Sequence, residues 1–262
     1  MKIRRFPTKN LATVYVATLV ENLVTNSPNP VLGLSTGSTP VKLYQQLVEF
    51  HRQGLSFARA VTINLDEYVG IPVDHPQSYH YFMMDHLFSK IDILPSNTFV
   101  PNGMAENLEE ECNRYDAILQ THPIDMQILG IGRNGHIGFN EPDLSLKTHT
   151  HVIQLTEDTI RANTRFFANG TGVPTRAITM GIQSILQAKT IVLMAFGRNK
   201  AEAVKRSLSG EVTTEVPASF LQMHPDVTFV LDDEAAVLLD DERIFHPHPQ
   251  LPEVPRFFHS MK

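Results

Sequence analysis

The chain has 262 residues, a hydrophobic fraction of 42% and a formal net charge of −6. This length suits one large α/β domain over residues 1–262, and no apolar run reaches the ~18 residues that a membrane-spanning helix needs. This negative net charge argues against a nucleic-acid-binding protein, in which a basic surface would be expected. The single cysteine, Cys112, excludes an internal disulfide, and no signal-type segment follows the basic N-terminus. We therefore expect a cytoplasmic protein with neither nucleic-acid nor membrane partners.

Apolar periodicity and turn signals predict strands that alternate with helices along the chain. Thr8 is expected to cap the first helix, and Thr39 to cap the second with Pro40 in its first position. The predicted helices lie at 11–24, from 40 onward, and at 78–88, 105–119, 157–167 and 199–208, and the predicted strands at 31–34, 61–65, 126–129, 177–180, 191–196 and 227–231. This alternation predicts a single-domain, doubly wound, mostly parallel sheet with helices on both faces, a Rossmann-like α/β fold.

A glycine-rich stretch, GIGRNGHIGFNEP at 130–142, follows one of the predicted strands. It contains one histidine, His136, and one glutamate, Glu141. An imidazole beside a carboxylate on a strand-end loop is how α/β folds assemble acid–base chemistry. Glu141 and Asn134 are the candidates for the partner that fixes the His136 tautomer. The embedded GxGxxG is weak evidence for a dinucleotide site, because no helical pattern opens at Gly135.

Two further loops follow predicted strands, where a doubly wound sheet gathers its ligands. The loop at 35–39, Ser-Thr-Gly-Ser-Thr, leads into a helix whose N-terminus suits a phosphate, although a plain strand-to-helix turn is the alternative. Asp66-Glu67-Tyr68 places two carboxylates after a strand, where burial can raise the pKa of a base. Solvated loop acids are the alternative at this position.

Several other chemistries lack residues that they require. The chain has no paired cysteines of a zinc deaminase. The His149/His151 and His246/His248 pairs resemble metal spacing, but no cysteine or acidic cluster accompanies them, so we expect no metal. Four basic residues are candidates for a phosphate-binding cation, and the sequence does not select among them: Arg161, Arg165, Arg198 and Lys200.

Five segments in a fixed order span nearly the whole chain: LGLSTGSTP at 32–40, NLDEYVGIP at 64–72, GIGRNGHIGFNEP at 130–142, ANTRFF at 162–167 and FLQMHPD at 220–226. Together they resemble the glucosamine-6-phosphate deaminase family (glucosamine/galactosamine-6-phosphate isomerases). The resemblance implies conversion of glucosamine 6-phosphate to fructose 6-phosphate and ammonia, by isomerisation coupled to deamination and without a metal or cofactor.

The resemblance also implies roles for individual residues. Asp66 matches the base that moves a proton between C2 and C1, and His136, assisted by Glu141, matches the group that opens the pyranose ring. The positions that match substrate-binding residues are Thr36, Gly37, Ser38, Thr39, Glu67, Gly135, Arg165 and Lys200. Because a carboxylate of ordinary pKa is a poor base, we expect Asp66 to be substantially buried once substrate is bound.

The chain departs from the family pattern in two places. Some members carry aspartate at the position of Asn134, so we hypothesise that Glu141 takes more of the electrostatic support of His136 here. Hexameric enterobacterial-type enzymes place serine, arginine and lysine in an allosteric phosphate pocket. The aligned residues here offer no permanent cation, so we expect little or no activation by N-acetylglucosamine 6-phosphate; they are Leu144, His151 and Ile153.

Two alternative functions remain open. A 6-phosphogluconolactonase is similar in fold and also binds a sugar phosphate, but it needs no base for a C2 proton. A sugar-phosphate-sensing domain would be expected to lose the acid–base residues and to carry a DNA-binding segment, for which the N-terminus before the first predicted strand has no room. The protein is expected to be a monomer or a homo-oligomer, with a lid at about 149–175 that carries Arg165 inward.

Overall fold

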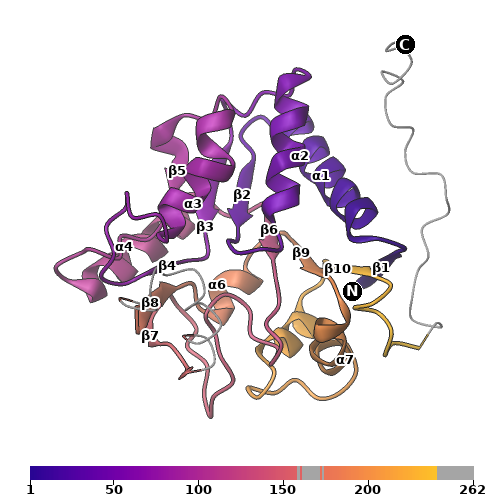
Figure 1. Ribbon diagram of the computed structural model, residues 1–262. Helices are drawn as coiled ribbons and strands as arrows, with labels where there is room; N and C mark the ends of the chain where they lie inside the picture. Colours follow the sequence, from indigo (N-terminus) through magenta and orange to yellow (C-terminus); the bar gives the residue numbers. More distant parts are fainter. Residues whose placement is uncertain (158–159, 161–171, 173, 241–262) are drawn as a thin grey trace.

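The computed structural model describes residues 1–157, 160, 172 and 174–240. Within these residues the main sheet has seven parallel strands in the order β1-β10-β9-β6-β2-β3-β5 (Figure 1). Their bounds are β1 Lys2–Phe6, β2 Val31–Leu34, β3 Val61–Asn64, β5 Thr98–Phe99, β6 Met126–Leu129, β9 Thr190–Ala195 and β10 Val227–Asp232. The predicted doubly wound, mostly parallel sheet is confirmed, although β1 and β5 were not predicted.

Helices cover both faces of this sheet and bury a separate hydrophobic cluster on each. One face carries α1 (Lys9–Asn26), α2 (Val41–Arg52) and α3 (Tyr79–His86), and the other carries α4 (Leu108–Thr121), α6 (Ile182–Leu186) and α7 (Ala201–Leu208). Short 3-10 turns complete the list: η1 Phe88–Lys90, η2 Pro95–Asn97, η4 Arg198–Lys200 and η5 Pro217–Met223. None of the described helices is long and apolar enough to cross a membrane.

A second, antiparallel sheet of three strands lies beside the first, in the order β4-β8-β7. Its strands are β4 (Asp66–Tyr68), β7 (His151–Gln154) and β8 (Arg176–Thr179). The prediction of a loop at 66–68 was therefore wrong, no strand was predicted at β7, and β8 does not join the parallel sheet. The cause is long-range pairing, because β4 obtains its hydrogen-bond partner from β8, far along the chain.

The helix starts show which capping signals the fold uses. Thr8 caps α1 as predicted, since its Oγ1 accepts a hydrogen bond from Leu11 N at 3.3 Å. The predicted Thr39 cap was wrong, because α2 begins at Val41 after a turn and has no side-chain cap. Pro40 is the residue that precedes the helix, which leaves Thr39 on the loop. The predicted helix at 157–167, most of the predicted lid and the proline-rich tail lie outside the described residues.

The centre of the sheet contains the topological switch point. From β2 the chain continues outward through β3 and β5, whereas from β6 it continues in the opposite direction through β9 and β10. Ligands of doubly wound sheets bind in the crevice where this reversal occurs, at the carboxyl ends of the strands. The loops at 35–39 and 130–142 follow β2 and β6, so they flank this crevice.

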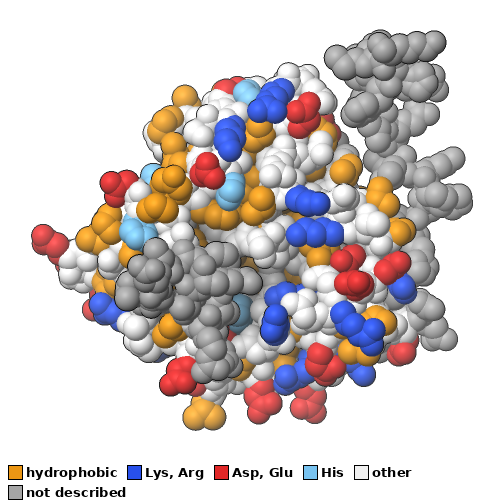
Figure 2. All heavy atoms as spheres, in the orientation of Figure 1, with side chains coloured by type: hydrophobic (Ala, Val, Ile, Leu, Met, Phe, Trp, Pro, Cys, Tyr) orange, Lys and Arg blue, Asp and Glu red, His pale blue; other side chains and the backbone are white. Residues whose placement is uncertain are grey.

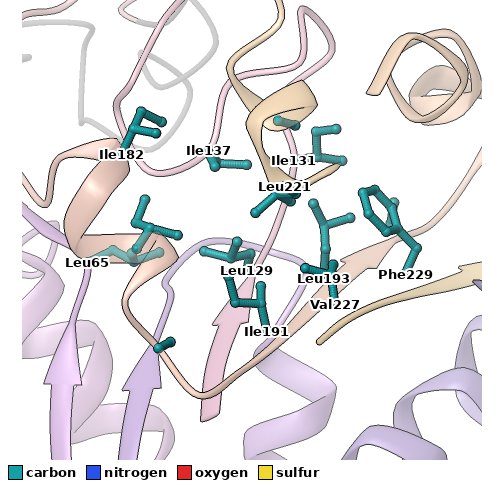
Figure 3. Close-up of a cluster of buried hydrophobic side chains, with 14 of the residues drawn as sticks. Leu65, Leu129, Ile131, Ile137, Ile182, Ile191, Leu193, Leu221, Val227 and Phe229 are labelled. Carbon is teal, nitrogen blue, oxygen red and sulfur yellow. The ribbon is translucent and has the colours of Figure 1, made fainter. Parts of the chain in front are cut away.

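Two side chains of the glycine-rich loop are buried in the hydrophobic core. Figure 3 shows Ile131 and Ile137 beside Leu129, Leu193 and Leu221 in one continuous cluster. Ile131 and Ile137 are 6% and 1% exposed, and burying a side chain of this size stabilises the fold by about 1.5–3 kcal/mol. The loop backbone is therefore fixed at both of these positions.

Candidate active site

The three segments predicted to carry chemistry meet at one place. A Cβ atom built on Gly130 would lie 3.9 Å from Thr39 Oγ1, and one built on Gly138 would lie 3.5 Å from Asp66 Oδ2. The loop at 130–142 therefore lies beside both the loop after β2 and the strand after β3. Lys200 joins them from η4, where its Nζ donates a hydrogen bond to Ile131 O at 2.6 Å.

Asp66 is the most strongly perturbed acid at this site. It opens β4 opposite Thr179 and is 6% exposed. Burial raises the pKa of its carboxyl to about 8, and the neighbouring charge of Glu67 adds to the rise. This carboxyl is thus desolvated, as a carboxyl base requires.

Glu67 is occupied by the backbone of α3. Its Oε1 accepts hydrogen bonds from Tyr68 N at 2.8 Å and from Tyr79 N at 2.9 Å, and its Oε2 accepts one from His80 N at 2.9 Å. Burial raises the pKa of Glu67 to about 7, while the three amide donors act in the opposite direction. Glu67 therefore binds the free N–H groups at the start of α3 and ties this helix to β4.

His136 has Glu141 as its acidic neighbour. His136 Nδ1 lies 2.9 Å from Glu141 Oε1, and their side chains are 27% and 4% exposed. The contact is an ion pair when the imidazole is protonated. Asn134 Nδ2 donates a hydrogen bond to Glu141 Oε2 at 2.6 Å, and Asn134 Oδ1 accepts one from His136 N at 3.2 Å. Of the two candidate partners, Glu141 faces the imidazole and Asn134 holds Glu141.

The glycines of the loop make room for the histidine. A Cβ atom on Gly132 would lie only 2.4 Å from His136 Cε1, so any larger residue there would displace the ring. Gly135 has a φ of +89°, and its Cβ would lie 2.7 Å from Val216 Cγ1. These glycines therefore shape the backbone around an imidazole and are not a dinucleotide fingerprint.

The loop after β2 turns at Gly37 and is open there. Gly37 has a φ of +93° with nothing within 4 Å of its Cβ position, and the Tyr44 hydroxyl donates a hydrogen bond to Ser35 O below the loop. Among the candidate cations, Lys200 reaches the site, and burial, followed by the charge of Arg133, lowers the pKa of its ammonium. Arg161 and Arg165 lie outside the described residues.

Two polar residues at the site were missed by the sequence reasoning. Thr179 Oγ1 accepts a hydrogen bond from Phe139 N at 3.2 Å, and Asn140 Nδ2 donates to Ile137 O and Met180 O at 3.0 and 2.9 Å. Both hold the loop at 130–142 against β8. Asn140 stood within the glycine-rich motif and could have been suspected, whereas no local signal marks Thr179. In the described part of the chain, no group of three His, Cys, Asp or Glu residues is placed to hold a metal ion.

Comparisons with known proteins agree with this geometry. The model of the family "Glucosamine-6-phosphate isomerases/6-phosphogluconolactonase" matches residues 8–230. A glucosamine-6-phosphate deaminase of Thermoanaerobacter pseudethanolicus is 55% identical over 228 residues, which cover 86% of this chain and 90% of that protein. The solved structure of a monomeric glucosamine-6-phosphate deaminase has a TM-score of 0.88 and 47% identity, covering 91% of this chain and 100% of that one.

A 6-phosphogluconolactonase from Leishmania guyanensis shares the fold at greater distance. Its TM-score is 0.72 at 20% identity, with 91% of this chain and 98% of that chain covered. At this identity the likeness concerns the fold alone, whereas the family model and the deaminase relatives cover most of the sequence. The chain belongs to the family of glucosamine-6-phosphate isomerases and 6-phosphogluconolactonases.

Proposed function

We propose that this protein converts glucosamine 6-phosphate and water to fructose 6-phosphate and ammonia. The observation that carries the proposal is the buried Asp66 beside a loop that holds His136 against Glu141. The relatives described above that share about half of the sequence are named glucosamine-6-phosphate deaminases. This site offers one acid–base group for ring opening and a second for proton transfer between carbon atoms.

Ring opening is assigned to His136. The imidazole takes the proton of the C1 hydroxyl while the C1–O5 bond breaks, and it returns a proton to O5. Glu141 stabilises the imidazolium that forms between these two events, because its carboxylate lies 2.9 Å from Nδ1 and is almost fully buried. Asn134 holds the second oxygen of Glu141, so the carboxylate keeps its orientation.

Proton transfer between C2 and C1 is assigned to Asp66. The ionised carboxylate takes the C2 proton of the open-chain amino aldehyde, and an enolamine forms as the C1 oxygen gains the proton that the substrate ammonium group releases. Return of a proton to C1 leaves an imine at C2. Water then adds to C2, its oxygen becomes the C2 carbonyl, and the nitrogen leaves as ammonia. The substrate ammonium group favours the ionised form of Asp66, which offsets the effect of burial.

Phosphate binding is assigned to the loop after β2, through Thr36, Gly37, Ser38 and Thr39, with Lys200 as a cation beside it. Free N–H groups in a loop that leads into a helix are suitable donors to a phosphate dianion. The resemblance adds Arg165 and Gly135, which we keep as expectations. We assign Glu67 to the positioning of β4 in place of direct substrate contact, because amides bind both of its oxygens.

The proposal is tested by a single assay with two substrates. Purified protein is incubated with glucosamine 6-phosphate while ammonia and fructose 6-phosphate are measured, and 6-phosphogluconolactone is supplied in a parallel reaction. Equal amounts of both products, with no lactone hydrolysis above the spontaneous rate, support the deaminase. Lactone hydrolysis without ammonia supports the lactonase, and binding of sugar phosphate without turnover supports a sensing domain.

A further inference from the structure

Asp232, the last residue of β10, binds the loop that follows the neighbouring strand β9. Its Oδ1 and Oδ2 accept hydrogen bonds from Gly197 N at 2.9 and 3.0 Å, and Oδ1 also accepts one from Ala235 N at 2.8 Å. Asp232 is 8% exposed, so these bonds lie away from bulk solvent. Asp232 takes no part in the reaction steps proposed for Asp66 and His136.

Gly197 lies directly before η4, the turn that carries Lys200. Its φ of +85° is in the left-handed region that favours glycine, so the chain changes direction there. Its N–H is bound by Asp232, and its C=O accepts a hydrogen bond from Lys200 N at 3.0 Å. The peptide groups on both sides of Gly197 are therefore fixed at the point where the chain enters η4.

The side chain of Lys200 extends these contacts to the glycine-rich loop. Its Nζ donates a hydrogen bond to Ile131 O at 2.6 Å. The residue before Ile131 is Gly130, and a Cβ atom built there would lie 3.9 Å from Thr39 Oγ1. An ammonium group has three protons to donate, and Ile131 takes one of them. The other two can bind a phosphate beside the loop at 35–39.

We propose that Asp232 is a positioning residue for phosphate binding, which holds η4 at Gly197 and so places the Lys200 ammonium beside the loop at 35–39. The inference deepens the proposed function and rests on it, because it takes Lys200 as the cation of the phosphate site. A carboxylate suits this task, since its hydrogen bonds with N–H groups are stronger than those of a neutral acceptor. The lysine stem is long and flexible, so a fixed backbone limits the conformations that Lys200 must give up when it binds a ligand.

Two substitutions of Asp232 separate the loss of its hydrogen bonds from the loss of its charge. Asp232→Ala removes both. Asp232→Asn removes the charge but keeps an acceptor, because Oδ1 alone accepts from Gly197 N and from Ala235 N, and an amide oxygen can take its place. The asparagine variant should therefore retain part of the phosphate affinity that the alanine variant loses.

Asp226→Ala is the matched control. Asp226 also connects β9 with β10, since its Oδ2 accepts a hydrogen bond from Thr190 Oγ1 at 3.0 Å, and its Oδ1 binds Lys2 Nζ at 3.0 Å. These contacts lie at the amino ends of the two parallel strands, at the opposite edge of the sheet from the candidate site. Asp226→Ala should lower stability without moving Lys200.

The test measures the binding of inorganic phosphate by calorimetry, together with KM and kcat for glucosamine 6-phosphate and the Tm of each variant. We expect Asp232→Ala to raise the phosphate Kd and the KM by about threefold to tenfold, with kcat within about threefold of wild type. Asp232→Asn should raise both by about twofold to threefold. Asp226→Ala should leave both at the wild-type values.

A double-mutant cycle tests whether Asp232 acts through Lys200. Lys200→Met removes the phosphate cation, so adding Asp232→Ala to it should raise the phosphate Kd no further. If Asp232→Ala does not fold, Asp232→Asn completes the same cycle. A further loss of affinity in the double variant, equal to that in the single one, would overturn the proposal.

Two other results would also overturn it. One is a phosphate affinity of Asp232→Ala and Asp232→Asn that equals wild type. The other is an equal loss of phosphate affinity in Asp226→Ala and Asp232→Ala, since that pattern reports general destabilisation.

These results are separable from the proposed function. If the wild-type protein binds phosphate but releases no ammonia, the deaminase assignment fails, while the calorimetric comparison still decides the role of Asp232. If the wild type releases ammonia and its phosphate affinity survives both substitutions of Asp232, the inference about Asp232 alone fails.

Discussion

Asp66 must lose its proton before it can act as a base, yet burial raises the pKa of its carboxyl to about 8. In the free enzyme, kcat/KM should therefore fall as the pH is lowered below about 8. The bound substrate places an ammonium group nearby, which favours the carboxylate. We expect the acid limb of kcat to lie at lower pH than that of kcat/KM, as measured by pH–rate profiles over pH 5–9. Coincident limbs would contradict this account.

Replacing Asp66 tests its catalytic role and its burial together. Asp66→Asn should lower kcat by about a hundredfold to ten-thousandfold, because the amide cannot accept the C2 proton, while phosphate binding remains. The folded protein holds the Asp66 proton up to about pH 8, whereas an unfolded aspartate loses it near pH 4. Between these values the folded state binds more protons, so Asp66 lowers the free energy of unfolding as the pH rises.

The variant should therefore be more stable than wild type by about 1–3 kcal/mol at pH 8 and no more stable at pH 4. Urea unfolding at both pH values measures this difference. Glu67 titrates in the same range, so the comparison between variant and wild type isolates Asp66. Asp74→Asn changes an exposed aspartate nearby and serves as the control. If Asp66→Asn raised the free energy of unfolding equally at both pH values, the increase would not come from the titration of Asp66.

We expect Asn134 to influence His136 through Glu141. Asn134→Asp removes the amide donor to Glu141 and adds a second negative charge beside the imidazole. The added charge favours the imidazolium, so we expect the pH–rate profile of Asn134→Asp to differ from that of wild type. Asn134→Ala removes the donor without adding charge and separates the two effects. An unchanged profile in Asn134→Asp would contradict the electrostatic role that we assign to Glu141.

At the scale of elements, the sequence predicted the strands and helix starts that depend only on residues close together in the chain. The apolar runs of β2 and β6 and the Thr8 cap of α1 were all present in the sequence around them. The three-stranded sheet was not predictable in this way, because β4 pairs with β8 and neither segment shows alternation long enough to indicate its partner. Thr179 was not predicted for the same reason, because it reaches the site only through the pairing of β8 with β4.

The sequence likewise predicted the residues of the candidate site but not all of their contacts. The types of residue and their strand-end positions pointed to Asp66, His136 and Glu141, because parallel strands bring their carboxyl ends together. The hydrogen bonds that occupy Glu67 were not predictable, since they depend on where the first turn of α3 is placed. The role of Asn134 was visible as a candidate, but its choice of Glu141 over the imidazole required the folded loop.

Strand β7 and the loop before it carry the aligned allosteric positions. Leu144 is 98% exposed, His151 lies in β7 with its pKa lowered by burial, and Ile153 packs against the cluster of the second sheet. A neutral imidazole and two aliphatic side chains offer no charge to a phosphate. We expect a hyperbolic rate curve that N-acetylglucosamine 6-phosphate changes by less than about twofold. A sigmoidal curve that this ligand abolishes would contradict the prediction.

At the scale of the whole molecule, the site depends on both halves of the sheet. The loop at 35–39 and β4 come from the β2–β3 side, whereas the loop at 130–142 and Lys200 come from the β6–β9 side. The hydrophobic clusters join the two sides. Figure 2 shows positive and negative side chains interspersed over the visible face. We therefore expect a few local donors at the switch point to recognise a sugar phosphate, within a chain whose net charge is −6.

The same comparison of sites leads to a prediction for the assembly state. An allosteric phosphate pocket transmits its signal between subunits, and the aligned positions here carry no cation for one. The solved relative that is 47% identical is described as monomeric. We expect this protein to be a monomer of 29.4 kDa, measured by light scattering after size-exclusion chromatography. Its specific activity should not change with protein concentration, because each chain contains all of the assigned catalytic groups. A sixfold larger mass, or activity that falls on dilution, would show that the site needs neighbouring subunits.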